Sequence, residues 1–145
     1  MQDLTEIWLR DHDGVEIQIL KPDTAYWVKV PELNFAQMFL NLLDNAYEAS
    51  DNTVITVEIQ EGANALLVQV RNSGSQFDKD VLERFGEPFV TTKSTGTGLG
   101  LYTAHLFMQS LGGSVKLSNA NQGAVVGAIV ELHFPASLKN QEATL

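Results

Sequence analysis

Three amide side chains recur at helical spacing in the segment that follows Pro31. Gln37, Asn41 and Asn45 stand four residues apart, so an α-helix would place them in one row beside its apolar stripe. Asparagine is a poor helix former, which makes two of them at this spacing an odd choice for a merely solvated surface. Amide oxygens are hard ligands that suit Mg²⁺. The row is therefore either a metal-binding face or a solvated face of the helix.

A second polar segment, Arg71 to Ser75, follows a predicted strand. A carboxamide such as Asn72 at a strand end can pair with the edge of a base, and Gly74 permits close approach of a backbone. Taken alone, the same residues are also ordinary turn chemistry.

A glycine-rich stretch leads directly into a predicted helix. Glycine occupies alternate positions there, at Gly96, Gly98 and Gly100. Backbone N–H groups at a helix N-terminus bind phosphate, and glycine lets the phosphate approach them. Flexible loops also collect glycine, so the pattern alone is weak. The dinucleotide fingerprint does not fit because no buried strand precedes the stretch, and the Walker-type loop does not fit because it lacks Gly-Lys-Ser/Thr.

Hydrophobic periodicity predicts two long helices that would hold these segments. Apolar residues at i, i+4, i+7, i+8 and i+11 between positions 35 and 46 predict a helix that starts near Pro31 and ends at Ser50. A similar stripe over 101–111 predicts a second helix, stopped by Gly112 and its neighbour.

The remaining periodic segments are short. Asp78 would cap a short helix over 78–85. Alternating residues predict strands over 14–20, 26–30, 53–60, 65–71, 114–118 and 125–134, of which the third and fourth form an antiparallel hairpin. Hairpins dominate, so the predicted fold class is α+β: a two-layer domain with a mixed, mostly antiparallel sheet and helices on one face.

The composition is that of one acidic globular domain. The chain has 145 residues, an apolar fraction of 44% and a formal net charge of −9, from 9 Lys+Arg against 18 Asp+Glu. A single domain is expected over residues 1–136, with a disordered tail over 137–145. The acidity argues against a nucleic-acid partner, and the short apolar runs argue against membrane insertion. The lack of cysteine excludes a disulfide scaffold and a thiolate metal site.

The order and distance of these segments resemble the catalytic ATP-binding domain of sensor histidine kinases. That domain has the Bergerat fold and belongs to a superfamily shared with DNA gyrase, heat-shock chaperones and mismatch-repair ATPases. The resemblance extends from about Leu4 to Pro135. It rests on an N box, QMFLNLLDNA over 37–46, an F box, RFGEPFVTTK over 84–93, and a second glycine box, TGTGLGL over 95–101.

The resemblance implies a role for each matching residue. Asn45 would bind the Mg²⁺ that bridges the phosphates of ATP. Asn41 stands where ATPase relatives have a water-activating glutamate, and an amide cannot act as a general base. The γ-phosphoryl group would therefore pass to a protein histidine rather than to water, under a mobile lid over 77–95. The catalytic residues implied are Asn41 and Lys93, and those implied for nucleotide binding are Asn45, Asn72, Gly74, Phe77, Thr92, Gly96, Thr97, Gly98, Leu99, Gly100 and Leu101.

The resemblance also implies partners. The phosphoryl acceptor would be a dimerisation domain of the same kinase, and a response regulator would act downstream in two-component signal transduction. His12, His105 and His133 lie outside the family's phosphoacceptor pattern and lack metal-ligand spacing, so each is expected to be structural or solvent-facing. The domain is expected to be cytoplasmic, whether or not its parent protein is anchored in a membrane, and monomeric in isolation.

The chain departs from the family's pattern at the adenine end. The first glycine box usually reads Asp-x-Gly-x-Gly, and its Asp accepts a hydrogen bond from the adenine amino group. Asn72 can accept only without charge, Gln76 replaces the second glycine and stiffens the turn, and Ala128 stands where the family often has Thr. The hypothesis is nucleotide binding with modest adenine affinity. At the phosphate end, three lid cations could reach the phosphates on closure: Lys79, Arg84 and Lys93.

Three alternatives stay open. The first is a nucleotide-binding interaction module without transfer activity, which the altered adenine end motivates. The second is an ATPase of the gyrase or chaperone kind, against which the amide of Asn41 argues. The third is an anti-sigma-factor serine kinase, against which the complete Phe-x-Thr-Thr-Lys block over 89–93 argues.

Overall fold

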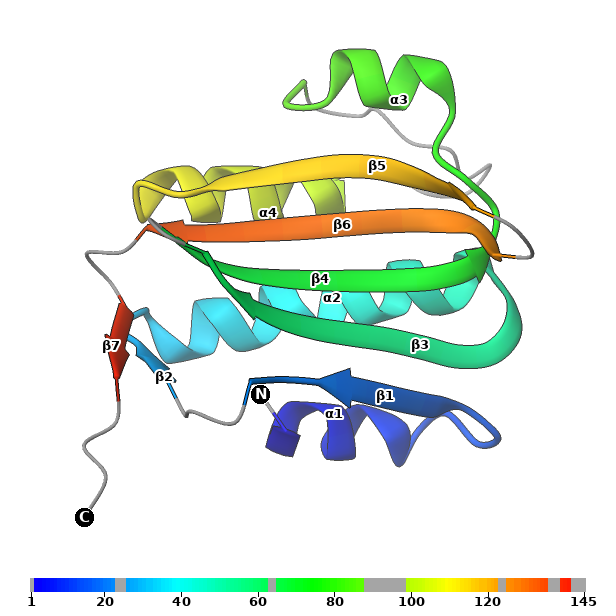
Figure 1. Cartoon of the computed structure of the whole chain (residues 1–145), viewed down its shortest axis with the longest axis horizontal. Helices are drawn as coiled ribbons and strands as arrows, with labels where there is room; N and C mark the ends of the chain where they lie inside the picture. Colours follow the sequence, from blue (N-terminus) through cyan, green and yellow to red (C-terminus); the bar gives the residue numbers. More distant parts are fainter. Residues whose placement is uncertain are drawn as a thin grey trace.

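The computed structural model describes residues 2–22, 26–62, 65–87, 99–122, 125–135 and 139–141. Figure 1 shows the arrangement of its helices and strands. The helices are α1 (Gln2–Leu9), α2 (Glu32–Ala49), α3 (Lys79–Arg84) and α4 (Leu99–Ser110). The strands are β1 (Glu16–Leu20), β2 (Tyr26–Val28), β3 (Ser50–Glu61), β4 (Ala65–Gly74), β5 (Ser114–Gln122), β6 (Val125–Pro135) and β7 (Lys139–Gln141).

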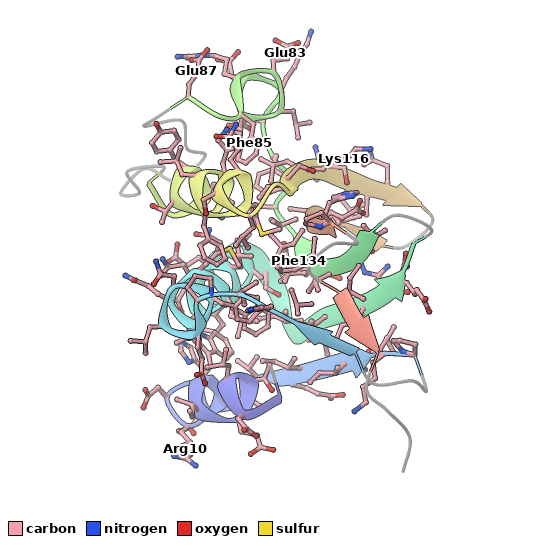
Figure 2. All side chains as sticks on the ribbon, turned by 90° about the vertical axis from the view of Figure 1, so that its left-hand side faces the viewer. Arg10, Glu83, Phe85, Glu87, Lys116 and Phe134 are labelled. Carbon is pink, nitrogen blue, oxygen red and sulfur yellow. The ribbon has the colours of Figure 1, made fainter. Side chains whose placement is uncertain are left out.

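Five of the strands form the main sheet, in the order β1-β3-β4-β6-β5. β1 pairs in parallel with β3, and the other neighbours are antiparallel. Turning the molecule by 90° shows α1, α2 and α4 on one side of this sheet (Figure 2). The prediction of a two-layer α+β domain with a mixed sheet is confirmed, and so is the hairpin made by β3 and β4.

The core lies between the sheet and the two long helices. Along β4, Val68 and Val70 are buried, and they alternate with more exposed residues, as expected for a sheet covered on one face. The buried residues of α2 are Met38, Phe39, Leu42, Leu43 and Ala46. The apolar stripe predicted for this helix is therefore its core face. Among the described helices, none combines the length and the apolarity needed to span a membrane.

The ends of the long helices follow from local chemistry. Pro31 is the N-cap of α2, where its missing N–H is not needed. α2 ends at Ser50 as predicted, and Ser50 also begins β3, because it pairs directly with Gly74 of β4. α4 ends as predicted: Gly112 adopts a φ of 78°, and the N–H of Gly113 donates to the carbonyl of Met108 at 2.9 Å.

Three elements, α1, β2 and β7, differ from the prediction. α1 was not predicted, since its eight residues are too few for a clear helical period, and packing against α2 supports it instead. β2 was expected to extend to Val30, but it ends at Val28 and pairs antiparallel with β7. β7 lies within the segment 137–145, which was expected to be a disordered tail.

Candidate functional site

The polar row of α2 meets α4 at two different places. A Cβ added to Gly100, in the first turn of α4, would lie 3.6 Å from Nδ2 of Asn45. Gln37, at the other end of the row, lines a groove together with Leu106 and Ser110 of the last turns of α4. The two helices are thus antiparallel neighbours, with Asn41 half-buried between these places. The structure brings Asn45 to the glycine box and keeps Gln37 away from it.

The end of β4 places a buried amide at the edge of the core. Asn72 is only 7% exposed, and its Nδ2 has no hydrogen-bond partner among the described residues. Ala128 of the adjacent strand β6 is buried as well. A Cβ on Gly127 would lie 1.8 Å from the backbone oxygen of Asn72, so only glycine lets the two strands approach this closely. Sequence reasoning missed Gly127, although a glycine inside a strand is the signal for such an approach.

Gly74 allows a close backbone approach, as predicted, but the approach is to the protein's own chain. Its φ is +132°, and an added Cβ would lie 2.4 Å from the carbonyl oxygen of Ala49 and 2.7 Å from the amide nitrogen of Asp51. The next residue, Ser75, donates its N–H to the same Ala49 oxygen at 2.8 Å. The end of β4 is therefore fixed to the junction between α2 and β3.

The segment between β4 and α3 is held to β5 by the side chain of Asn119, which bonds both backbone groups of Phe77. We call this pair of bonds a clamp, and the sequence did not predict it. Asn119 of β5 accepts from the backbone N–H of Phe77 at 2.8 Å and donates to the Phe77 carbonyl at 2.9 Å. Gln76 adds a bond from its Nε2 to the carbonyl of Ala120 at 3.1 Å, and a further one to the side-chain oxygen of Asn121. Gln76 thus links this turn to β5 through its side chain. No local pattern in the sequence marks Asn119, because its partner lies 42 positions away.

The residues directly after α3 contact α4 at His105. The ring of Phe85 meets the ring of His105 edge-on, with centroids 5.4 Å apart, and a Cβ on Gly86 would lie 3.4 Å from the same imidazole. Figure 2 labels Phe85 below α3. His105 is half-buried, which fits the structural role expected for it. The two cations of this segment are engaged with acids: Lys79 with Glu83 at 3.7 Å, and Arg84 with Glu87 at 2.9 Å.

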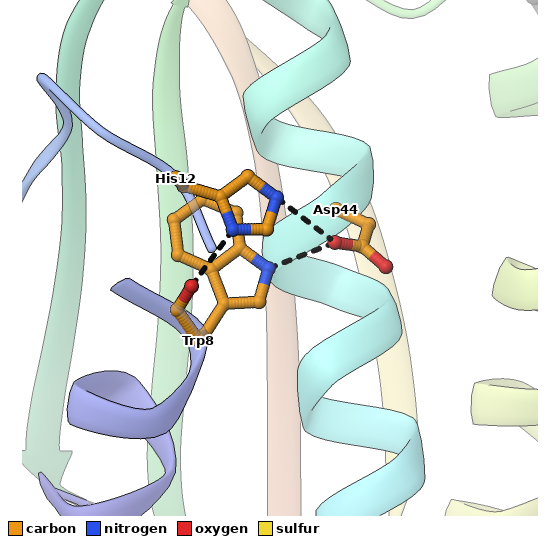
Figure 3. Close-up of polar contacts among 3 residues, drawn as sticks. All are labelled: Trp8, His12 and Asp44. Carbon is orange, nitrogen blue, oxygen red and sulfur yellow. Dashed lines mark hydrogen bonds and ion pairs between the residues drawn. The ribbon is translucent and has the colours of Figure 1, made fainter. Parts of the chain in front are cut away.

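A second polar cluster lies where α1 contacts α2, as Figure 3 shows. Trp8 of α1 donates from its Nε1 to Oδ1 of Asp44 at 2.8 Å. The His12 ring stacks on the indole at 3.7 Å, and its Nδ1 donates to the Trp8 carbonyl at 2.7 Å. Tyr47 meets both rings edge-on. Asp44 directly precedes Asn45, so α1 contacts α2 beside the candidate metal ligand.

Part of the predicted site lies outside the described residues. Of the residues that the sequence assigned to it, Leu99 and Gly100 begin α4, and Leu101 packs against the core. Within the described ranges, no group of three His, Asp or Glu residues could hold a metal ion. The predicted residues outside these ranges are Thr92, Lys93, Gly96, Thr97 and Gly98.

Comparisons with known proteins identify the family and the fold of the chain. The family described as histidine kinase-, DNA gyrase B-, and HSP90-like ATPase matches residues 30–138. The C4-dicarboxylate transport sensor protein DctB of Pseudomonas aeruginosa is 32% identical over 129 residues, which cover 83% of this chain and 21% of DctB. The mycobacterial sensor histidine kinase MprB superposes with a TM-score of 0.79 at 20% identity, over 92% of this chain and 91% of that structure. Full-length ShkA, solved in complex with AMPPNP, has a TM-score of 0.78 at 20% identity and matches 99% of this chain and 30% of that one.

The chain belongs to the histidine kinase-, DNA gyrase B- and HSP90-like ATPase family. Within that family it is a catalytic ATP-binding domain of the kind found in sensor histidine kinases, as its 30% identity to the sensor histidine kinase ZraS of Escherichia coli over 88% of this chain indicates. The chain spans less than a third of the length of the curated relatives it matches.

Proposed function

We propose that this chain binds Mg-ATP and transfers the γ-phosphoryl group to a histidine on a separate dimerisation domain. The observation that carries the proposal is the contact between the two halves of the site. Asn45 of α2 lies beside Gly100 at the start of α4, where 3.6 Å separates its Nδ2 from the position of a Cβ. An amide ligand and a glycine-rich helix start, far apart in the sequence, thus meet at one point. That pairing suits a polyphosphate.

The phosphates are held in this proposal by backbone groups rather than by basic side chains. The first N–H groups of α4 have no partner within the helix and favour an anion. Gly96, Thr97 and Gly98 precede them and add further N–H groups. The oxygen of Asn45 is a hard ligand that suits Mg²⁺, which when bound neutralises phosphate charge. A chain with a net charge of −9 can bind a triphosphate in this way.

Asn41 decides between transfer and hydrolysis in this proposal. It lies one helical turn before Asn45, half-buried on α2. Its carboxamide does not take up a proton at neutral pH, so it cannot activate water as a general base. Water is then a poor acceptor, and a histidine brought in by a partner domain receives the phosphoryl group. In the lid, Thr92 contributes to nucleotide binding and Lys93 contributes to catalysis.

The partners are inferred from the similarity of this chain to sensor kinases. The relatives are sensor proteins and kinases several times longer than this chain. The acceptor histidine belongs to a dimerisation domain of the same kinase, and the phosphoryl group then passes to a response regulator. The domain acts in the cytoplasm, where ATP is available, and is monomeric in isolation.

The test is phosphoryl transfer between separated domains. The chain is mixed with the dimerisation domain of its own kinase and with ATP labelled at the γ-phosphate. We expect acid-labile label on the dimerisation domain, lost in Asn45→Ala and retained in Asn34→Ala, which changes an exposed amide on the same helix. Binding of ATP without transfer would instead identify a nucleotide-binding interaction module. Turnover of ATP by the chain alone would identify an ATPase.

A further inference from the structure

The carboxamide of Asn72 is a buried polar group whose donor is unused. The residue is 7% exposed, and its Nδ2 has no hydrogen-bond partner among the residues that the structure describes. An amide donor buried without a partner is destabilising relative to one that is satisfied. The donor is therefore expected to serve a contact with a ligand.

The position of Asn72 in the sheet points its side chain toward the helices. Val68, Val70 and Asn72 alternate along β4 and are all buried, so they share the face covered by α2 and α4. β4 and β6 pair as far as Arg71 and Ile129, and one step further Asn72 lies level with Ala128.

The surroundings of this amide are apolar on the side of β6. Ala128 is 5% exposed and contributes only a methyl group, and Gly127 contributes no side chain at all. Neither residue supplies a side-chain hydroxyl or a charge. Among these three residues, the Asn72 side chain is the one that can form a directed hydrogen bond with a base.

The chemistry of a carboxamide differs from that of a carboxylate at this place. A carboxylate only accepts, so it suits the 6-amino group of adenine and opposes a 6-oxo group. A carboxamide has an oxygen that accepts and an NH₂ that donates, and its last torsion is two-fold. A half-turn therefore exchanges an acceptor for a donor at nearly the same position. The unused Nδ2 is the donor that a 6-oxopurine requires.

We propose that Asn72 lets this site accept 6-oxopurine nucleoside triphosphates as well as ATP. The inference rests on the proposed function and on the family resemblance, which implies that Asn72 lies at the base. Asn72 accepts from a 6-amino group or donates to a 6-oxo group, so it does not select between the two. The preference for adenine is lost because Asn72 adds a hydrogen-bond donor, not because the pocket binds the base more weakly.

The experiment compares ATP with inosine triphosphate, which replaces the 6-amino group by an oxo group and adds no 2-amino group. Binding of each to the chain is measured by isothermal titration calorimetry with excess Mg²⁺. We expect dissociation constants within about tenfold of each other, since one exchanged hydrogen bond is made in both complexes. In Asn72→Asp the ATP preference should rise by about tenfold or more, because the donor is gone. Asn34→Asp adds the same charge on an exposed part of α2 and should leave the ratio unchanged.

Each outcome decides a different point. An ATP preference above about tenfold in the unaltered chain overturns the inference and leaves the proposed function intact. An unchanged ratio in a folded Asn72→Asp variant also overturns it, because the base would then be selected elsewhere. Absence of binding for both nucleotides overturns the proposed function itself. If Asn72→Asp does not fold, as circular dichroism would reveal, the comparison in the unaltered chain decides alone.

Discussion

The indole of Trp8 and the carboxylate of Asp44 join the first helix of the domain to α2. Trp8 Nε1 donates to Asp44 Oδ1 at 2.8 Å across 36 positions of the chain, and the indole is only 5% exposed (Figure 3). The stacked ring of His12 closes one side of the contact. The hydrogen bond fixes the position of α1 along α2, while the buried ring supplies the larger part of the stabilisation.

Replacing Trp8 separates these two contributions. Trp8→Phe keeps an aromatic ring but removes the N–H, so we expect a loss of about 1 kcal/mol in the free energy of unfolding. Trp8→Ala also removes the buried ring and should cost about 3–5 kcal/mol. Urea denaturation measures both. A Trp8→Phe variant as stable as the unaltered chain would show that the bond to Asp44 contributes nothing.

Two glycines with positive φ test how closely β4 approaches the α2–β3 junction. Gly74→Ala places a Cβ 2.4 Å from the Ala49 oxygen and should lower stability by about 3 kcal/mol or more, from overlap added to backbone strain. Gly14→Ala also introduces backbone strain, at a φ of +80°, but with no atom within 4 Å, and should cost about 1 kcal/mol. Thermal unfolding of the two variants gives the comparison. Equal losses would mean that the approach to Ala49 is not tight.

The clamp between Asn119 and Phe77 is testable by hydrogen exchange. Asn119→Ala removes bonds to both the N–H and the carbonyl of Phe77, each worth about 1 kcal/mol. We expect faster amide exchange over residues 77–87, with little change in α2. Lys116→Ala, at an exposed position of the same strand, is the matched control. Unaltered exchange in Asn119→Ala would show that the segment is held by other contacts.

The segment after α3 contacts α4 through the ring of Phe85, while α3 itself buries Val81. Phe85→Ala removes the edge-on contact with His105, a pair worth about 0.5–1.5 kcal/mol beyond its buried area, so α3 amides should exchange faster. Lys79→Ala removes only an ion pair of a lysine that is 87% exposed, and α3 should keep its protection. The prediction fails if both variants leave the exchange of α3 unchanged.

Much of the architecture could be predicted from local patterns. The stripe from Phe35 to Ala46 has helical spacing, and a helix must bury such a stripe. The hairpin of β3 and β4 joins neighbours in the sequence, so alternation and a short turn suffice to predict it. The parallel pairing of β1 with β3 and the pairing of β2 with β7 join distant segments, and no local pattern specifies them.

The candidate site likewise combines residues that local motifs predict with residues whose role appears only in the folded chain. Asn45 and Gly100 belong to recognisable motifs, and the structure places them in contact. Asn72 could be assigned to the base from its position, but its burial and its unused donor appear only once the strands are paired. Asn119 carries no signal, because an asparagine in a strand becomes a clamp only when a distant backbone lies opposite it.

The contacts of Asp44 and Asn45 have a mechanical consequence. Consecutive residues of a helix are set about 100° apart, so one turn of α2 contacts α1 through Asp44 and α4 through Asn45. The helix is rigid over this distance. A twist of α1 that rotates α2 about its axis must therefore shift Asn45 against the start of α4. Asp44 and Asn45 are neighbours in the chain, so the motion passes between them without intermediate residues.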